Sequence, residues 1–386
     1  MAEFDWYKCK FLESGENLKP LVHARVGRTP STTIAREIAA CLLQGRLFYQ
    51  AAASSPLEIQ PLQLFYGMVG FARALITARR VESLATLSHA HGISDTSSAN
   101  SRIAELTVRI DEAGTFQEFN DVVAELNRFC YFDESTAPRA LYLPSAKSDQ
   151  LAGLRLSLKE ILSRIPQLED LFHNTFHEDP NVNAIYLHNL RESNGYWQLV
   201  VFDPQRFPDV ASLRQIVERW RERHPFLKDW CLVSAARAYG KSQICFGNVS
   251  NAGIDEFGEA YLDGDGDWYE AKVDPLRNTA LERFPIEKRL PPPAGGYPGG
   301  GNWAITHVNG VYFSEFALHY LAMFLLSSLV RYRPQTWEHA VSRTGLPDAP
   351  TDDQPLALIE RFLEINSTAI PSLVVTALNP HEDQYA

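Results

Sequence analysis

Histidine, arginine and acidic side chains stand at several spacings that could support chemistry. His173 and His177 are four residues apart, so on a helix both imidazoles would lie on one face at metal-ligand distance, with Asp179 as a third ligand. The glutamate of an HExxH metalloprotease helix is missing between them, and a histidine near a helix C-terminus also complements the helix dipole. A metal-dependent enzyme is therefore the weaker interpretation, and we predict neither a metal nor another cofactor.

His89 and His91 precede Gly92–Ile93 in a loop that could be extended. In an extended segment, residues two apart point to the same side, so both rings would lie together. We favour a structural hydrogen bond to the backbone for these rings over a functional role for His91.

Two loops resemble ligand sites but break the required pattern. The acidic run 263–274 has the spacing of a calcium loop, yet Trp268 occupies the position that needs glycine. The run Gly295–Gly301 could hold a phosphate with backbone N–H groups, but it lacks a lysine and the strand–loop–helix context of a P-loop. We interpret the first as a solvated hairpin and the second as part of a linker.

Charge and cysteine usage limit the class of protein. The net charge of −11 argues against general nucleic-acid affinity and leaves only local basic groups, such as Arg73, Arg79 and Arg80 or Arg331 and Arg333. The five cysteines have no zinc-ligand spacing and suit free thiols in a reducing compartment. The N-terminus lacks the apolar segment of a signal peptide, so we expect a cytoplasmic protein without a membrane partner.

The segment 313–337 organises the predicted fold. It is apolar on nearly every face from Phe316 to Val330, which is typical of a buried helix, and it is too short to span a membrane. Helices are also predicted over 34–53 and 62–80, and we expect the second of these to pack on the buried helix. Gly67 and Gly70 lie inside it, which indicates a close helix–helix contact. Residues 1–30 look largely irregular, and a last helix is predicted to start near Pro371.

The middle of the chain has a different pattern. Alternating residues flank Ser193–Asn194–Gly195 and Tyr239–Gly240, which predicts two strand pairs, and residues 210–223 have helical spacing. We predict an α+β, predominantly α-helical fold, with a helical core from the N- and C-terminal regions and a smaller β-containing middle subdomain. The expected boundaries are 1–178 for the first helical region, 179–290 for the α+β subdomain, 291–303 for a Pro/Gly linker and 304–386 for the C-terminal helices.

Three segments resemble the YaaC-like family of bacterial proteins. They are PLQLFYGMVGFARALI (61–76) with the following HGI (91–93), ALHYLAMFLLSSLVRYRPQTW (317–337) and ALIERFLEINSTAIPSLVV (357–375). The resemblance implies a mostly helical protein of bacterial or phage-related origin. The family has no assigned reaction, so the resemblance implies no catalytic residues.

Arg333 and His339 have a spacing similar to that of the HEPN ribonucleases, which are helical, metal-independent enzymes. In that chemistry the imidazole moves a proton from the attacking 2′-hydroxyl and the guanidinium stabilises the phosphate charge. Pro334 departs from the pattern, which usually has a polar residue after the arginine. The other interpretation is that both residues lie at a turn between helices, with Arg331 or Arg333 in an internal ion pair or capping helix carbonyls.

The sequence therefore supports two functional hypotheses. We favour a non-enzymatic interaction or regulatory component of a larger bacterial system, for example an antiphage defence system, with a protein partner of unknown identity. The alternative is an HEPN-like, metal-independent ribonuclease with Arg333 and His339 as catalytic residues, RNA as its partner and a site formed across a homodimer.

Overall fold

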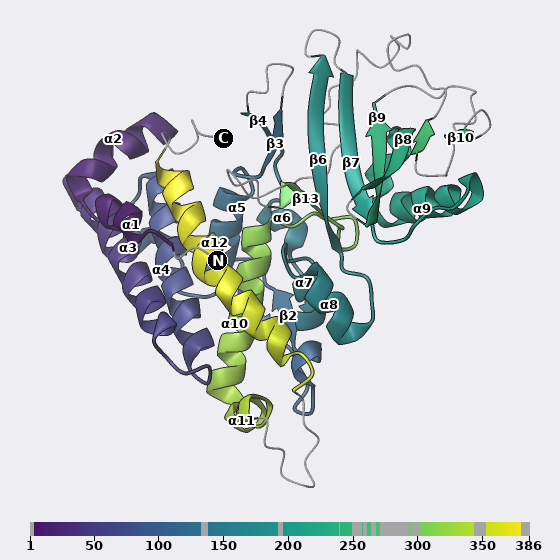
Figure 1. The fold of residues 1–386 in the computed structure, drawn as a ribbon. Helices are drawn as coiled ribbons and strands as arrows, with labels where there is room; N and C mark the ends of the chain where they lie inside the picture. Colours follow the sequence, from purple (N-terminus) through teal and green to yellow (C-terminus); the bar gives the residue numbers. More distant parts are fainter. Residues whose placement is uncertain are drawn as a thin grey trace. The chain divides into compact units, whose positions relative to one another are not determined.

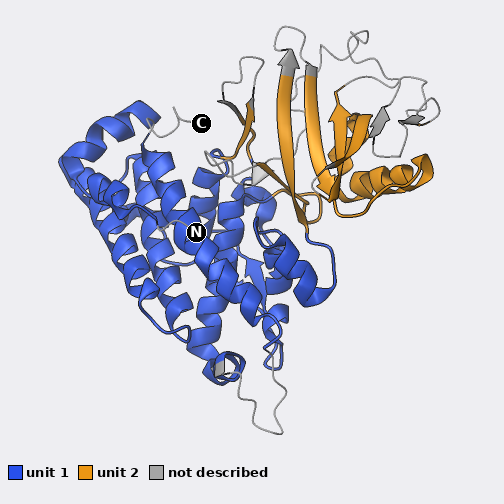
Figure 2. Ribbon diagram, viewed as in Figure 1, with its two compact units in different colours: residues 1–126, 145–180, 313–385 blue, residues 127–144, 181–312, 386 orange. Residues whose placement is uncertain are grey.

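The computed structural model describes residues 4–132, 138–191, 196–238, 240–248, 257, 261–263, 268–270, 293–294, 302–342 and 353–379. Contacts within the chain divide it into two compact units, and each is described by itself (Figure 2). Unit 1 comprises Met1–Leu126, Ser145–Pro180 and Phe313–Tyr385, whereas unit 2 comprises Asn127–Pro144 and Asn181–Tyr312, together with Ala386. Most of the predicted linker at 291–303 lies outside the described residues.

Unit 1 is helical and joins the two ends of the chain, which confirms the predicted helix-dominated α+β fold with a core of N- and C-terminal segments. Its helices are α1 (Trp6–Leu12), α2 (Gly15–Val26), α3 (Thr32–Ala53), α4 (Gln60–Arg80), α5 (Thr115–Val123), α6 (Ser148–Leu151), α7 (Leu158–Leu162), α8 (Glu169–Phe176), α10 (Glu315–Tyr332), α11 (Pro334–Ser342) and α12 (Leu356–Leu378). Helix α2 replaces much of the irregular structure that we predicted before residue 30.

Helix α10 is the buried helix that the sequence predicts. Ser314 caps its N-terminus by accepting a hydrogen bond from the backbone N–H of Ala317, and every residue from Glu315 to Leu329 is buried. Helices α4, α5 and α7 contact it, and α12 meets it through Phe362 and Asn366, which lie beside His319; Figure 1 shows α10 among these helices. The predicted contact between α10 and the 62–80 helix is therefore confirmed.

Glycines allow helices α3 and α4 to approach each other closely, as predicted. A Cβ atom added at Gly70 would lie 3.0 Å from the backbone nitrogen of Gly45 and 3.1 Å from the carbonyl oxygen of Cys41. Because both are backbone atoms, neither can move aside without shifting a helix. The small residues thus set the spacing between α3 and α4, and α4 in turn packs against α10.

A buried polar chain links three helices inside this core. The hydroxyl of Tyr49 donates to Asn366 Oδ1 at 2.8 Å, and Asn366 Nδ2 lies 3.0 Å from His319 Nδ1. This pairing leaves the imidazole proton on Nε2, which faces Glu315 Oε1 at 3.6 Å. The chain gives α3, α10 and α12 specific contacts that an apolar interface would lack.

The helix predicted to start near Pro371 is in fact the last part of α12, which runs through that proline without ending. A proline inside a helix removes a backbone hydrogen bond and usually bends or breaks the helix. Here Pro371 is buried together with its neighbours Ile370 and Leu373, so packing of the apolar face maintains the helix.

Unit 1 also contains a small antiparallel sheet of β1 (Ile93–Asp95), β2 (Thr107–Ile110) and β5 (Arg155–Ser157), with β2 in the middle. Helix α10 contacts β1 and β2. The sheet is short, but it fixes the segment that begins at His91 beside α10.

The described residues of unit 2 form a ten-stranded sheet and one α-helix, α9 (Val210–Arg223). The strands are β3 (Arg128–Phe132), β4 (Pro138–Tyr142), β6 (Val182–Arg191), β7 (Tyr196–Asp203), β8 (Cys231–Ala238), β9 (Lys241–Gly247), β10 (Tyr261–Asp263), β11 (Trp268–Glu270), β12 (Pro293–Ala294) and β13 (Asn302–Ile305). The pairs β6–β7 and β8–β9 are antiparallel, which confirms both predicted strand pairs. Their order is β10-β11-β8-β9-β7-β6-β13-β12, with β3 paired to β6 and β4 to β3.

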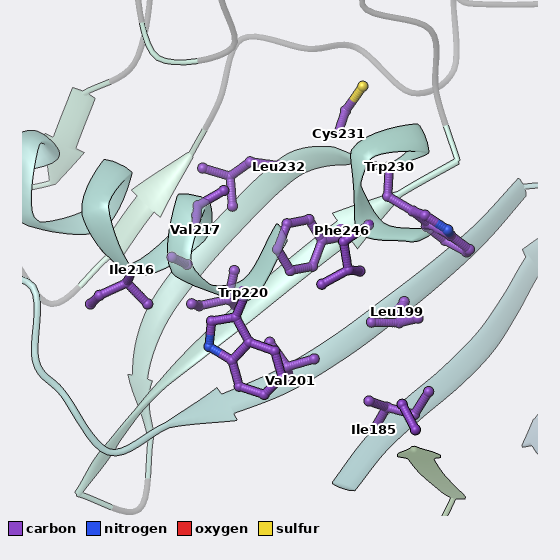
Figure 3. Packing of buried hydrophobic residues seen from close by; sticks show 14 of the residues in the cluster. Ile185, Leu199, Val201, Ile216, Val217, Trp220, Trp230, Cys231, Leu232 and Phe246 are labelled. Carbon is purple, nitrogen blue, oxygen red and sulfur yellow. The ribbon is translucent and has the colours of Figure 1, made fainter. Parts of the chain in front are cut away.

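The apolar face of α9 covers the sheet of unit 2. Ile216, Val217 and Trp220 of the helix belong to one buried cluster with sheet residues such as Leu199 and Phe246 (Figure 3). Their helical and alternating spacings place these side chains on facing surfaces. Unit 2 therefore has a hydrophobic core of its own.

We predict that Gly70→Ala destabilises the protein although alanine is the better helix former by about 1 kcal/mol. The added methyl group would overlap the backbone of α3, and such overpacking costs roughly 1–3 kcal/mol. Urea denaturation should therefore show a lower free energy of unfolding. Gly15→Ala is the control, because its added Cβ would meet only ordinary contacts at 3.6 Å. Equal effects of the two variants would contradict the close contact.

Candidate functional site

A pocket of about 600 Å³ lies in unit 1, where the end of helix α10 meets strand β1. Its walls combine basic, polar and apolar side chains from two segments that are far apart in sequence. The lining residues are His91, Ile93, Asp95, Ala99, Phe324, Ser328, Arg331, Tyr332 and Arg333. This size is within the range of pockets that hold small organic ligands.

The spacing of the lining residues follows the two elements that carry them. Ile93 and Asp95 are alternate residues of β1, so they share one side of the strand, and His91 lies just before the bend at Gly92 that leads into it. Phe324, Ser328 and Arg331 are four and three residues apart, which places them on one face of α10. The pocket is therefore the space between one side of a strand and one face of a helix.

Close backbone contact between two glycines fixes the segment that contains His91. Gly92 and Gly114 both have positive φ angles, of 76° and 152°, and a Cβ at Gly114 would overlap the backbone of Gly92. Gln117 Nε2 donates to the carbonyl of Gly92 at 2.7 Å, and the N–H of Phe116 donates to the carbonyl of His91 at 2.9 Å. The N-terminal turn of α5 thus fixes the position of His91.

Asp95 is the one carboxylate among the residues that line the pocket, and it already accepts several hydrogen bonds. Its Oδ1 accepts from the backbone N–H of Ser97 at 2.9 Å and from the Ser97 hydroxyl. Its Oδ2 accepts from the hydroxyl of Ser328 at 2.8 Å, which links β1 to α10. Because a carboxylate has about four acceptor sites, Oδ2 retains capacity for one further donor.

Arg333 fastens the loop after β1 to the end of α10. Its Nη1 donates to the carbonyl of Ser98 at 2.6 Å, and its Nη2 donates to the carbonyl of Ser97 at 3.1 Å. Charge-assisted hydrogen bonds of this kind are stronger than neutral ones. The residue therefore has a structural role whether or not it also contacts a ligand.

Arg331 has a different environment. Its Nε donates to the carbonyl of Ser327 at 3.2 Å, and its guanidinium carbon lies 4.9 Å from the ring centroid of Tyr332. Among the residues that the structure describes, its two terminal nitrogens have no hydrogen-bond partner and no carboxylate pairs with it. The guanidinium is partly covered by protein and still able to donate.

His91 adds a titratable group to the same pocket. Burial lowers its pKa, and the positive charges of Arg331 and Arg73 lower that pKa further, so the ring is neutral at pH 7. Its ring lies 5.4 Å from that of Phe65 and 6.1 Å from that of Phe324. The expected hydrogen bond of this ring to the backbone is absent from the described part of the chain.

The structure places the predicted residues in different surroundings. Arg333 lines the pocket, whereas His339 lies on α11, is partly buried and is not among the lining residues. His173 is in α8, but His177 caps that helix in a left-handed conformation with φ of 53°, so the two imidazoles do not share a regular helical face. The predicted acidic loop 263–274 and the glycine run lie mostly outside the described residues.

The described residues contain no group of three or more histidine, cysteine or acidic side chains that could hold a metal ion. His173 Nδ1 lies 3.9 Å from Asp179 Oδ1, and it lies 3.2 Å from the backbone carbonyl of Glu178. These contacts join the end of α8 to the segment that follows it.

Asp95 and Ser328 are the lining residues that sequence reasoning missed. Both had a usable signal, because Asp95 continues the alternation of His91 and Ile93, and Ser328 is a polar residue inside an otherwise apolar helix. Neither signal predicts that the two side chains meet. Their contact depends on the packing of β1 against α10, which joins residues more than 230 positions apart.

The family model described as YaaC-like Protein matches residues 16–378. The chain belongs to the YaaC-like family. The match covers all three segments in which the sequence resembles the family, so the predicted resemblance is confirmed. No curated protein and no solved structure matches this YaaC-like chain.

The described helices of this YaaC-like protein were also compared with the length and hydropathy that a bilayer requires. None of them is both long enough and apolar enough to cross a membrane. Helix α10 is buried inside unit 1 instead.

Proposed function

We propose that this YaaC-like chain is a non-enzymatic regulatory component of a larger bacterial system, such as an antiphage defence system, and that it works in the cytoplasm by binding an anion in the α10 pocket. The observation that carries the proposal is the guanidinium of Arg331 at the pocket wall, whose two terminal nitrogens have no partner among the described residues. Arg333 adds a second positive charge, and the carboxylate of Asp95 is already hydrogen-bonded.

The overall charge of the chain makes this arrangement informative. With 47 acidic residues against 36 lysines and arginines, carboxylate partners are plentiful. A partly covered arginine is normally paired, because removing its charge from water is unfavourable. Arg331 lacks such a partner in the described part of the chain, and a bound anion would supply one.

We predict that sulfate binds to the protein and that Arg331→Ala weakens this binding roughly 10- to 100-fold, the range expected when a charge-assisted contact is lost. Isothermal titration calorimetry measures both affinities. Arg79→Ala is the matched control, because Arg79 forms an exposed ion pair with Glu125 and is not among the pocket residues. Binding that is absent from the wild type, or unchanged in Arg331→Ala, would contradict the proposal.

The same titration has an expected pH dependence. Burial, and then the charges of Arg331 and Arg73, lower the pKa of His91 in the free protein, and a bound anion would offset the two charges and raise that pKa again. Binding therefore takes up protons, so sulfate should bind more tightly as the pH falls from about 8 towards 5, where histidine titrates. His91→Gln should reduce this dependence, because it removes the group that takes up the proton.

A protein partner is the second part of the proposal, and we take it to be a second copy of the chain. Between Ala40 and Ala51 the exposed residues of α3 are uncharged, and Leu43 and Leu47, one turn apart, are 39% and 52% exposed. A two-fold interface brings a surface against itself, so a charged face would repel its copy and an uncharged apolar face would not.

We predict that the wild type is a dimer in solution and that Leu47→Glu shifts it to the monomer, because two buried carboxylates would oppose each other at the interface. Multi-angle light scattering measures the mass of each. Ala53→Glu introduces the same charge at an exposed position on another side of α3 and should leave the dimer intact. A monomeric wild type would show that this face is not a dimer interface.

The ribonuclease remains the second candidate because Arg333 lines the pocket. Catalysis would need His339 and Arg333 to meet the same phosphodiester. Two features support the regulatory alternative instead: Arg333 already donates to two loop carbonyls, and His339 is not among the lining residues. Arg333→Ala would also release the loop, so His339 is the better position for a test.

We expect no cleavage when the purified wild-type protein is incubated with labelled tRNA without added metal. His339→Ala and Arg333→Lys are assayed beside it, and His173→Ala, at an exposed histidine of α8, is the matched control. Gel electrophoresis of the products gives the result. Cleavage by the wild type and the control, lost in His339→Ala, would establish the ribonuclease and overturn the non-enzymatic proposal.

A further inference from the structure

The α10 pocket is larger and more varied than a site for a simple inorganic anion. Its volume of about 600 Å³ suits a small organic molecule, and an inorganic phosphate would fill only a small part of it. Ile93, Ala99 and Phe324 form apolar wall. A ligand that fills the pocket must therefore combine an anionic group with an apolar or planar body.

The basic side of the pocket suits a phosphate group. Both terminal nitrogens of Arg331 are without a partner among the described residues, and a planar guanidinium can bind two phosphate oxygens at once. Arg333 lies two residues further along the chain and lines the same pocket. Together they can neutralise a doubly charged phosphate monoester.

Asp95 offers a site for hydroxyl groups. Its Oδ2 accepts one hydrogen bond from Ser328 and can accept another from a ligand. A carboxylate repels phosphate but accepts hydrogen bonds from the hydroxyls of a ribose, as acidic residues do in dinucleotide-binding folds. The pocket thus presents an acceptor for a sugar as well as cations for a phosphate.

Tyr332 supplies an aromatic surface at the pocket. Its side chain lines the pocket, and the residue is 71% exposed, with the guanidinium of Arg331 over one face of the ring. Nucleobases stack on tyrosine rings and on arginine planes. We infer that the ligand of the α10 pocket is a ribonucleoside monophosphate, with its phosphate on Arg331 and Arg333, its ribose on Asp95 and its base against Tyr332.

This inference rests on the proposed anion-binding function and names the class of its ligand. A free mononucleotide fits better than a nucleic-acid strand for two reasons. The volume of the pocket suits one nucleotide, and the net charge of −11 opposes a long polyanion along the surface.

The test compares AMP, GMP, CMP and UMP with pyrophosphate, with the matching nucleosides and with 2′-deoxynucleoside monophosphates, by isothermal titration calorimetry on the full chain. We expect at least one ribonucleoside monophosphate to bind more tightly than pyrophosphate, than its nucleoside and than its deoxy form. Tyr332→Ala should weaken the nucleotide roughly 10-fold or more, and should weaken it more than it weakens pyrophosphate. Tyr332→Phe, which keeps the ring, should bind the nucleotide as the wild type does.

The outcomes distinguish a failure of the nucleotide inference from a failure of the proposed anion-binding function. If pyrophosphate binds through Arg331 and every nucleotide binds equally well or less well, the anion site stands and the nucleotide inference is overturned. The same conclusion follows if only single-stranded RNA binds, or if Tyr332→Ala has no effect. If no anion binds in a way that depends on Arg331, the proposed function fails and the inference fails with it. Arg331→Lys, which keeps the charge, is the second variant in case Arg331→Ala does not fold.

Discussion

Burial of helix α10 on every face from Glu315 to Leu329 is the constraint on which unit 1 depends. A helical segment without a solvent face needs neighbours on every side, and α4, α5 and α7 supply them together with Phe362 of α12. The close approach of α3 and α4 at Gly45 and Gly70 is part of the same arrangement. The N- and C-terminal segments therefore form one core although nearly 240 residues separate α4 from α10.

The candidate site follows from the place where this burial ends. Over its last turn α10 changes from apolar residues to Arg331, Tyr332 and Arg333, because the helix leaves the core there. Backbone carbonyls accept hydrogen bonds from Arg333 and from Nε of Arg331, whereas the carboxylate of Asp95 is bonded to Ser328 instead. The pocket combines an apolar wall with the terminal nitrogens of Arg331, which have no partner in the described part of the chain, and this arrangement is suited to binding an anionic molecule.

Rigid supports surround that pocket, which favours a preformed site. Gly92 and Gly114 cross without space for a side chain, and Gln117 holds the carbonyl of Gly92. Arg333 holds the following loop, and Ser328 joins β1 to α10 through Asp95. A ligand that enters such a site loses little binding free energy to ordering of the protein.

The sequence alone determined the elements with strong local patterns. Periodicity of apolar residues, turn residues and short motifs are local properties of a sequence. They predicted the buried helix α10, the close contact at the glycines of α4, both strand pairs of unit 2 and the family membership. Local rules failed at α12, where burial of Pro371 and its neighbours maintains a helix that a proline should end.

Only the tertiary structure decided the candidate site. His91 and Asp95 lie more than 200 residues before Ser328 and Arg331, and no local pattern specifies which strand packs against the end of a buried helix. The tertiary structure also places His339 away from the pocket that Arg333 lines. Between the two residues the chain turns at Pro334 and begins a new helix.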